Sequence, residues 1–497
     1  MGVVIAGHML NRAPSSNRGL RVVVALALAS ALVGPAAGAG SFVGSSGAEA
    51  YGHLWVQAWV TDAWPVWPTG TAMANGASAW PVIDPLPTWF AGGLARALTA
   101  LGMDGPRGAW NAYAFLGVFI ASLGGASLAE AAGGRWEVGA VGIGAAPIFV
   151  GSLASGLSED WMVGLVAFAI ANALRSRWLR AGAILGITAW CGLYLAWLGA
   201  AALVGIAIYR WADWRRWLAG GLIAAALGSG AAWPFRARLA GEGHRSGNFT
   251  PRAEPLWRIS PWKSSDLAAF VTPGKVDTAG AVVREHPTYL GWTTIGLGVA
   301  AVVPPSVPVV LAAAGLAATI SVAAGETVSI AGTPTRAENP IATLFRQLPL
   351  AGRFNHLGRT MLLGQMVLVA IAARGARRFR PGAAAILILA ETTFLSPARV
   401  PLPGTPGTAP DIYLALATLP PAPVLVIGER HPQKPFFDQR FHGRRIMMNP
   451  NGGPPGRAAP GTIIVAFGDA IPALTAERGT PTVTTSDGAA WLVESAN

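Results

Sequence analysis

Acidic side chains are few in this chain, and one lies where it could act as a base. In the stretch GAEAYGHLWVQAWVTDAW (47–64), a helix from Ala48 to Ala63 would place Glu49 and His53 on one face. A carboxylate held against an apolar surface has a raised pKa and can take a proton from a hydroxyl group. The alternative is an interfacial helix with a solvated acid, which the tryptophans of the stretch favour at a lipid–water boundary: Trp55, Trp59 and Trp64.

Four more acids belong to the same group of candidates. Asp62 ends the stretch, and Asp84 begins IDPLPTWF, where it could cap the helix that runs to Leu101. Glu159 and Asp160 stand in SGLSEDWM, a short segment between two apolar runs, where they could cap the next helix or face a pocket. The candidate site therefore has three predicted catalytic acids, Glu49, Glu159 and Asp160, and three predicted substrate-binding residues, His53, Asp62 and Asp84.

Basic side chains complete the candidate site. The stretch LPLAGRFNHLGRTM carries Arg353, His356 and Arg359, which we also predict to bind substrate. Arginine binds phosphate groups in a forked geometry, although anchoring among lipid headgroups is an equal alternative. Acids and arginines on one face of a membrane protein would suit the transfer of a group from a lipid phosphate.

The elements that must position these residues are membrane spans. The chain is 52% hydrophobic and 12% charged, whereas soluble proteins are about 25% charged. Several apolar runs reach the roughly 20 residues that cross a bilayer. Much of the net charge of +12 lies in short clusters between these runs, which indicates helix orientation and not nucleic-acid binding. A single cysteine, Cys191, excludes an intrachain disulfide and a cysteine metal site.

Arginine clusters set the predicted topology. A basic N-terminus before the first apolar run is expected in the cytoplasm, with that run either retained as a helix or cleaved as a signal peptide. The clusters at 175–180, 210–217 and 373–380 are all cytoplasmic if residues 180–209 form a hairpin of short helices that turns near Gly192. The fold class is then an all-α polytopic membrane protein of about eleven segments. Further spans are expected at 109–128, 137–156, 161–174, 218–236, 287–303, 306–325, 358–373 and 383–397.

The pattern changes after the last predicted span. Beyond the Pro- and Gly-rich SPARVPLPGTPGTAP, the runs PVLVIG and GTIIVAF are short and β-like, and TPTVTTSDGAAWLVES suggests a closing pair of strands. We therefore expect a small α/β or β-rich extracytoplasmic domain. The predicted division is an N-terminus with the first helix, a first outer loop, a bundle with outer loops at 237–286 and 326–357, and this domain: 1–40, 41–108, 109–397 and 398–497.

This arrangement of spans, acids and loops resembles a known group of membrane proteins. The acid and H-x-W of the first loop, its DPL turn, GLSEDW, the hairpin RAGAILGITAWCGLYLAWLG and LAGRFNHLGR are similar to features of bacterial YfhO-like proteins and, more broadly, of C-type (GT-C) glycosyltransferases. The resemblance implies a bacterial inner-membrane enzyme. Such an enzyme would transfer a sugar from a polyprenyl-phosphate donor to a glycan, lipid or protein acceptor outside the cytoplasm.

The resemblance also implies roles for individual residues. Glu49 would be the base, and Glu159 or Asp160 would orient the acceptor or hold a divalent cation. Arg353 and Arg359 would bind the leaving lipid phosphate. The chain differs from the family pattern in having a single acid at Glu49 and Gly358 where proline is usual.

Two other classes of function stay open. A transporter or flippase of a lipid-linked substrate would need ionisable residues within the spans, and the predicted spans hold almost none. A non-catalytic membrane assembly protein with the same fold would tolerate replacement of Glu49, Glu159 and Asp160. Membrane lipids are expected partners in every case, and nucleic acid in none.

Overall fold

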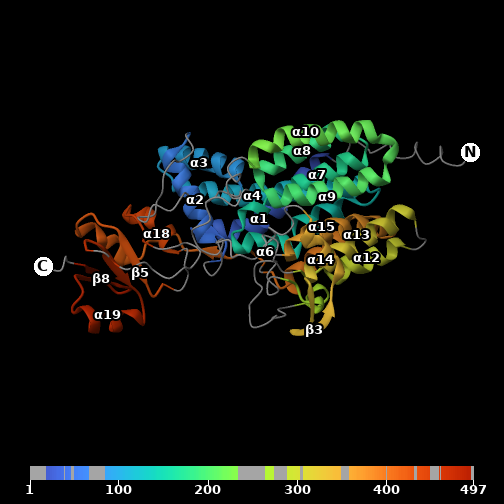
Figure 1. Ribbon diagram of the computed structural model, residues 1–497. Helices are drawn as coiled ribbons and strands as arrows, with labels where there is room; N and C mark the ends of the chain where they lie inside the picture. The colour runs from blue at the N-terminus through green and yellow to red at the C-terminus, as the bar shows by residue number, and fades with distance from the viewer. Residues whose placement is uncertain are drawn as a thin grey trace, which may run out of the picture.

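The computed structural model describes most of the chain and divides it into a helical bundle and a smaller C-terminal part (Figure 1). The described residues are 18–38, 40–45, 50–65, 84–232, 264–273, 288–302, 306–348, 357–398, 400–429, 434–447, 458 and 460–493.

The bundle holds helices at each position where a span was expected. Within the described residues, five helices are long and apolar enough to cross a membrane, or six if one bent pair counts as a span. Several other predicted spans are shorter helices, so the count of about eleven stays a prediction. The bundle helices are α1 (Arg18–Gly38), α4 (Gly105–Ala131), α5 (Trp136–Gly144), α6 (Pro147–Ser155), α7 (Val163–Leu174), α8 (Trp178–Cys191), α9 (Leu193–Tyr209), α10 (Trp214–Ala232), α12 (Trp292–Val302), α13 (Val307–Ala324), α15 (Met361–Gly375) and α16 (Ala383–Phe394).

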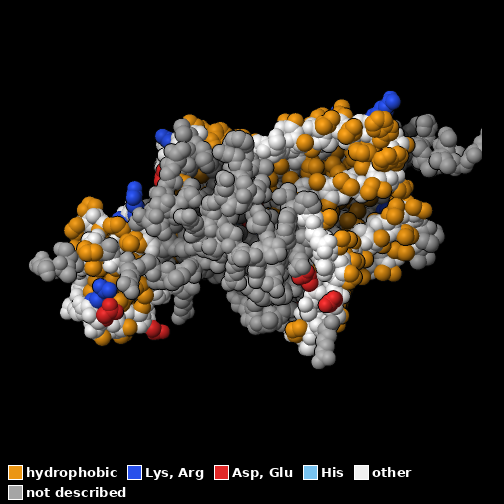
Figure 2. All heavy atoms as spheres, in the orientation of Figure 1, with side chains coloured by type: hydrophobic (Ala, Val, Ile, Leu, Met, Phe, Trp, Pro, Cys, Tyr) orange, Lys and Arg blue, Asp and Glu red, His pale blue; other side chains and the backbone are white. Residues whose placement is uncertain are grey.

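Large apolar side chains are exposed on the outside of this bundle. They gather over α8–α10 and over α12–α13 (Figure 2) and include Ile187, Val204, Ile208, Leu222, Val299 and Val310. A surface of this kind is unfavourable in water and favourable in lipid. Together with the long apolar helices, it indicates a membrane protein.

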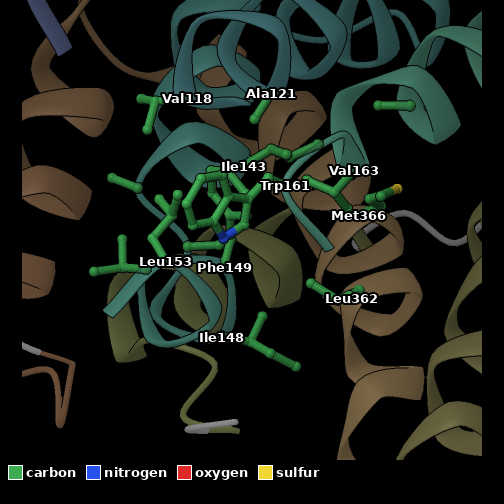
Figure 3. Packing of buried hydrophobic residues seen from close by; sticks show 14 of the residues in the cluster. Val118, Ala121, Ile143, Ile148, Phe149, Leu153, Trp161, Val163, Leu362 and Met366 are labelled. Atoms are coloured by element: carbon green, nitrogen blue, oxygen red, sulfur yellow. The ribbon is translucent and has the colours of Figure 1, made fainter. Parts of the chain in front are cut away.

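Small residues let the central helices pack closely. A Cβ atom on Gly125 of α4 would lie 2.1 Å from the carbonyl oxygen of Gly139 on α5, and one on Gly124 would lie 2.3 Å from that of Gly164 on α7. In lipid, water supplies no hydrophobic driving force between helices, so van der Waals contacts at such close approaches hold them together. Around them, side chains of α4–α7 and α15 interlock about Trp161 (Figure 3).

The hairpin predicted near Gly192 is present. α8 ends at Cys191 and α9 begins at Leu193. Residues equally far from the turn meet, since a Cβ on Gly199 would lie 2.6 Å from Cδ1 of Leu185.

All three arginine clusters lie at one end of the bundle. Glu130, in the last turn of α4, accepts a 2.7 Å hydrogen bond from Arg21 of α1 and lies 3.7 Å from Arg175 after α7. Ser176 donates to Asp213 in η4 (Trp211–Asp213) and so joins the second cluster to the first. Arg377, in η11 (Ala376–Arg378), donates to the carbonyl of Gly133 and adds the third. We call this the arginine end; α4 separates it from the opposite end by about 40 Å.

The opposite end carries the segments that were expected as outer loops. They are α2 (Ala50–Ala63), α3 (Pro85–Ala100), η3 (Ser158–Asp160), η8 (Leu267–Phe270), α14 (Pro340–Gln347), η10 (Leu357–Thr360) and the two strand pairs β1 (Phe42–Val43) with β4 (Gly404–Thr405) and β2 (Thr327–Ile330) with β3 (Thr333–Glu338). The β2–β3 hairpin was not predicted. The carboxylate of Asp266 holds its turn by accepting hydrogen bonds from the amides of Ala331 and Gly332.

The C-terminal part is a mixed four-stranded sheet with helices. The strand order is β5-β6-β8-β7, with β5 (Val424–Ile427) parallel to β6 (Ile463–Ala466) and the pair β7 (Val483–Thr484) and β8 (Ala489–Leu492) antiparallel. All four predicted β segments are strands. The helical elements here are α17 (Asp411–Ala415), η12 (Leu416–Thr418), α18 (Lys434–His442) and α19 (Ala470–Arg478).

Candidate active site

The turn that carries Glu159 and Asp160 is fixed by glycine. Gly156 ends α6 at φ 71°, and a Cβ there would lie 2.5 Å from Cα of Ala50 at the start of α2. Gly192, at the tip of the α8–α9 hairpin, approaches the turn from another side, since its Cβ would lie 2.4 Å from the carbonyl of Glu159. The alternative role as helix caps is wrong for both acids, because α7 begins only at Val163 and Met162 is its N-cap. Both acidic side chains are instead buried.

Glu159 lies between two basic side chains. Its Oε1 accepts a 2.7 Å hydrogen bond from Nη2 of Arg359, and its Oε2 lies 3.4 Å from Nε2 of His53. Among the described residues, no group donates a hydrogen bond to this Oε2 atom. The side chain is only 1% exposed, so its negative charge depends on these two partners and not on water.

Asp160 shares the same arginine. Its Oδ2 accepts a 3.1 Å hydrogen bond from Oγ of Ser152 and lies 3.7 Å from Nε of Arg359. The guanidinium of Arg359 also lies 4.7 Å from the ring centre of Tyr194, a cation–π contact. One arginine therefore orients both carboxylates, although it is 200 residues away in the sequence.

His53 extends the network toward α3. Its Nδ1 lies 3.0 Å from Oγ of Ser158, so Ser158 and Glu159 contact the two ring nitrogens. The hydroxyl of Tyr113 donates to the carbonyl of Ser158 at 2.8 Å and lies 3.3 Å from Oδ2 of Asp84. The imidazole thus lies between Ser158 and Glu159, and Tyr113 connects Ser158 to Asp84 at the start of α3.

Asp84 is at the N-cap position of α3, as expected, but it does not cap the helix. Its side chain accepts no backbone hydrogen bond from the first turn and accepts one from the hydroxyl of Thr88 at 3.0 Å. Burial raises the pKa of Asp84 to about 6, and the nearby His53 opposes that shift. The carboxyl group can therefore exchange protons near neutral pH.

The other predicted site residues lie elsewhere. Asp62 is on the exposed side of α2, where partial burial raises its pKa and Arg96 of α3 opposes the shift. Glu49, Arg353 and His356 lie outside the described residues.

The described residues do not form a cation site. No group of three or more His, Cys, Asp or Glu side chains among them is arranged to hold a metal ion. Glu159 already pairs with His53 and Arg359, a basic environment that competes with a cation for the carboxylate.

Sequence reasoning missed the neutral members of the network. Ser158 could have been noticed, because it directly precedes the two acids. Ser152, Tyr113 and Tyr194 lie within apolar helices, and no local signal marks them. The interfacial role expected for Trp55 is also wrong, because this side chain is 4% exposed and packs against Phe436 of α18.

Solved structures include chains that are similar to this one. The chain is similar to the crystal structure of an oligosaccharyltransferase of Archaeoglobus fulgidus in the apo form, with a TM-score of 0.49 and 11% sequence identity. The match covers 88% of this chain and 65% of that one, so the chain spans less than two thirds of that protein's length. No protein-family model matches the chain, and neither does any curated protein.

Proposed function

We propose that the chain is an integral membrane glycosyltransferase that transfers a sugar from a polyprenyl-phosphate donor to an acceptor on the extracytoplasmic face. The observation that carries this proposal is the pair Glu159 and Asp160, which is buried at the end of the bundle and held by Arg359. A carboxylate in such a place can serve as the base that an attacking hydroxyl requires.

The transfer divides into coupled bond changes. The acceptor hydroxyl loses its proton to a carboxylate as its oxygen bonds to the anomeric carbon of the sugar. The bond from that carbon to the phosphate oxygen breaks, and the electron pair leaves with the polyprenyl phosphate. Glu159 and Asp160 are the candidate bases among the described residues, beside Glu49 from the sequence.

Arg359 takes a different role in this proposal from the one expected. Since it contacts both acids and a tyrosine ring, it holds the carboxylates in place. Binding of the leaving phosphate, expected for Arg353 and Arg359, stays a prediction.

The location of the acids supports the proposed side of the membrane. Arginine-rich short loops favour the cytoplasmic face. Because the acids lie at the end of α4 opposite the arginine end, transfer is proposed outside the cytoplasm, in a bacterial inner membrane.

The test is sugar transfer by the full chain, purified into lipid and given a pool of polyprenyl-phosphate-linked sugars and cell-envelope acceptors. Glu159→Gln keeps the shape and a hydrogen-bond acceptor for Arg359 but removes the negative charge. If Glu159 is the base, this variant loses at least about 100-fold in kcat. Asp160→Asn and Glu49→Gln, assayed beside it, identify the base if Glu159→Gln retains activity.

A matched control separates catalysis from a general loss of charge. Asp104→Asn changes an exposed N-cap acid that is 38% exposed and pairs with Arg107 at the same end of the bundle. We expect this variant to transfer sugar as the wild type does. Absence of transfer by the folded wild type from every donor would refute the proposal and favour a transporter or an assembly protein.

A further inference from the structure

Helix α2 has two buried faces that serve different parts of the molecule. His53 and Trp55 are two positions apart, which separates them by about 200° around a helix. His53 contacts Ser158 and Glu159, whereas Trp55 contacts α18 of the C-terminal part. A displacement of either face must therefore move the other.

The contact with α18 is specific in its geometry. Nε1 of Trp55 donates a 3.0 Å hydrogen bond to Oε1 of Gln439, and the ring centre of Trp55 lies 5.2 Å from that of Phe436. Gln439 is itself oriented, because its Nε2 donates to the carbonyl of Arg444 at 2.8 Å. A buried indole N–H that loses its acceptor is costly, so this bond fixes the rotation of α2 about its axis.

The C-terminal sheet also uses α2 to complete its core. Trp55, Val56 and Val60 belong to the same buried cluster as one face of the sheet, which contributes Val424, Val426, Ile463, Val465 and Ala490. The other face has a separate cluster that includes Trp491 and Leu474 of α19. α2 is thus a shared element of the bundle end and the C-terminal part (Figure 1).

A second aromatic contact lies one turn earlier on α2. The ring of Tyr51 lies 5.1 Å from that of Phe437 on α18, and Phe42 of β1 lies 5.6 Å from the same ring. The helix start next to these contacts packs against the turn of the acids, since Ala50 faces Gly156. The path from α18 to the acids is therefore short and made of buried contacts.

We propose that the C-terminal part positions His53 against Glu159 through α2, with Trp55 and Gln439 as the positioning residues. The catalytic effect of this positioning rests on the proposed function, in which Glu159 is a candidate base. His53 would stabilise the charge of Glu159 only while the imidazole stays at its 3.4 Å separation.

The test compares two tryptophans that each lose one hydrogen bond from the indole N–H. Trp55→Phe removes the N–H donor to Gln439 and keeps an aromatic ring beside Phe436. Trp491→Phe is the matched control, because Nε1 of Trp491 donates to the carbonyl of Gly479 at 2.9 Å on the opposite face of the sheet. Both variants are made in the full chain and purified into lipid.

The first measurement is the rate at which diethyl pyrocarbonate modifies His53, followed by mass spectrometry. The imidazole is 8% exposed and should react slowly in the wild type. We expect a rate about tenfold higher in Trp55→Phe and an unchanged rate in Trp491→Phe. Equal rates in Trp55→Phe and wild type, or equal increases in both variants, would overturn the inference.

The second measurement is sugar transfer by the same proteins. Loss of position predicts a kcat about tenfold lower for Trp55→Phe with the KM for the donor unchanged, and a double change with Gln439→Met should be no worse. A fall in kcat shared by Trp491→Phe would contradict this. If the wild type transfers no sugar, the proposed function fails, while the modification rates still decide whether α2 couples the two parts.

Discussion

Two carboxylates and an arginine are buried together at the candidate site. When an ion pair is buried, its mutual attraction barely offsets the free energy of hydration that is lost. A protein with apolar residues of equal volume in its place is often as stable. Glu159 and Arg359 are 1% and 4% exposed, so their pairing adds little net stability. The proposed sugar transfer would use such a pair, because proton transfer requires a group that can change its charge in a fixed place.

Asp84 gives this network a predicted dependence on pH. Its pKa is raised to about 6 in the folded chain, against about 4 in an unfolded one. Between these values the unfolded chain has released the proton that the folded chain keeps, so folding stability falls as pH rises from about 4 to about 6. The loss is on the order of 3 kcal/mol at most, at 1.4 kcal/mol for each pKa unit.

The measurement is thermal unfolding of the wild type and of Asp84→Asn in detergent across this pH range. The asparagine can still accept the hydrogen bond from Thr88 but cannot ionise. We expect the Tm of the wild type to fall relative to that of the variant as the pH rises from 4 to 6. Parallel curves for the two proteins would mean that Asp84 keeps an ordinary pKa.

At the scale of elements, the site depends on the close approach of α2 to the turn of the acids. Gly156 has φ 71°, and an added Cβ would meet Cα of Ala50 at 2.5 Å. Gly156→Ala must therefore push α2 away from η3 as well as strain the backbone. We expect a loss of sugar transfer of about 100-fold, the effect of a 1 Å misplacement, together with a lower Tm.

A second glycine provides the control for backbone strain. Gly382, the N-cap of α16, has φ 78° and open space where a Cβ would be. Gly382→Ala should cost roughly 1 kcal/mol in stability and leave transfer intact. If the two variants lose activity equally, the contact between Gly156 and Ala50 has no special role in the site.

Local elements could be predicted from the sequence because their signals are local. Long apolar runs gave the helices, and short β-branched runs between Gly and Pro gave all four strands of the C-terminal sheet. The β2–β3 hairpin was missed because its turn is held by Asp266, 65 residues away in the chain. A turn stabilised from such a distance leaves no pattern in its own residues.

At the scale of the whole molecule, the contacts between distant segments could not be predicted. The acids Glu159 and Asp160 were identified from their place in a short loop, but nothing near them specifies Arg359 or His53 as partners. Trp55 was assigned to the lipid interface, since an aromatic helix beside a span often lies there. Its hydrogen bond to Gln439 crosses 384 residues, and only the folded chain brings them together.

The distribution of charge over the whole molecule makes a last prediction, about its orientation. If the arginine end faces the cytoplasm, Arg216, whose side chain is 71% exposed there, is inaccessible from outside the cell. Asp104, at the other end of α4, is then accessible. A membrane-impermeant maleimide should label Asp104→Cys in intact cells and Arg216→Cys only after permeabilisation.

The wild type is the control, because Cys191 is 4% exposed and should stay unlabelled. The reverse pattern would place the buried acids on the cytoplasmic side and contradict transfer to an extracytoplasmic acceptor, whatever chemistry the acids perform.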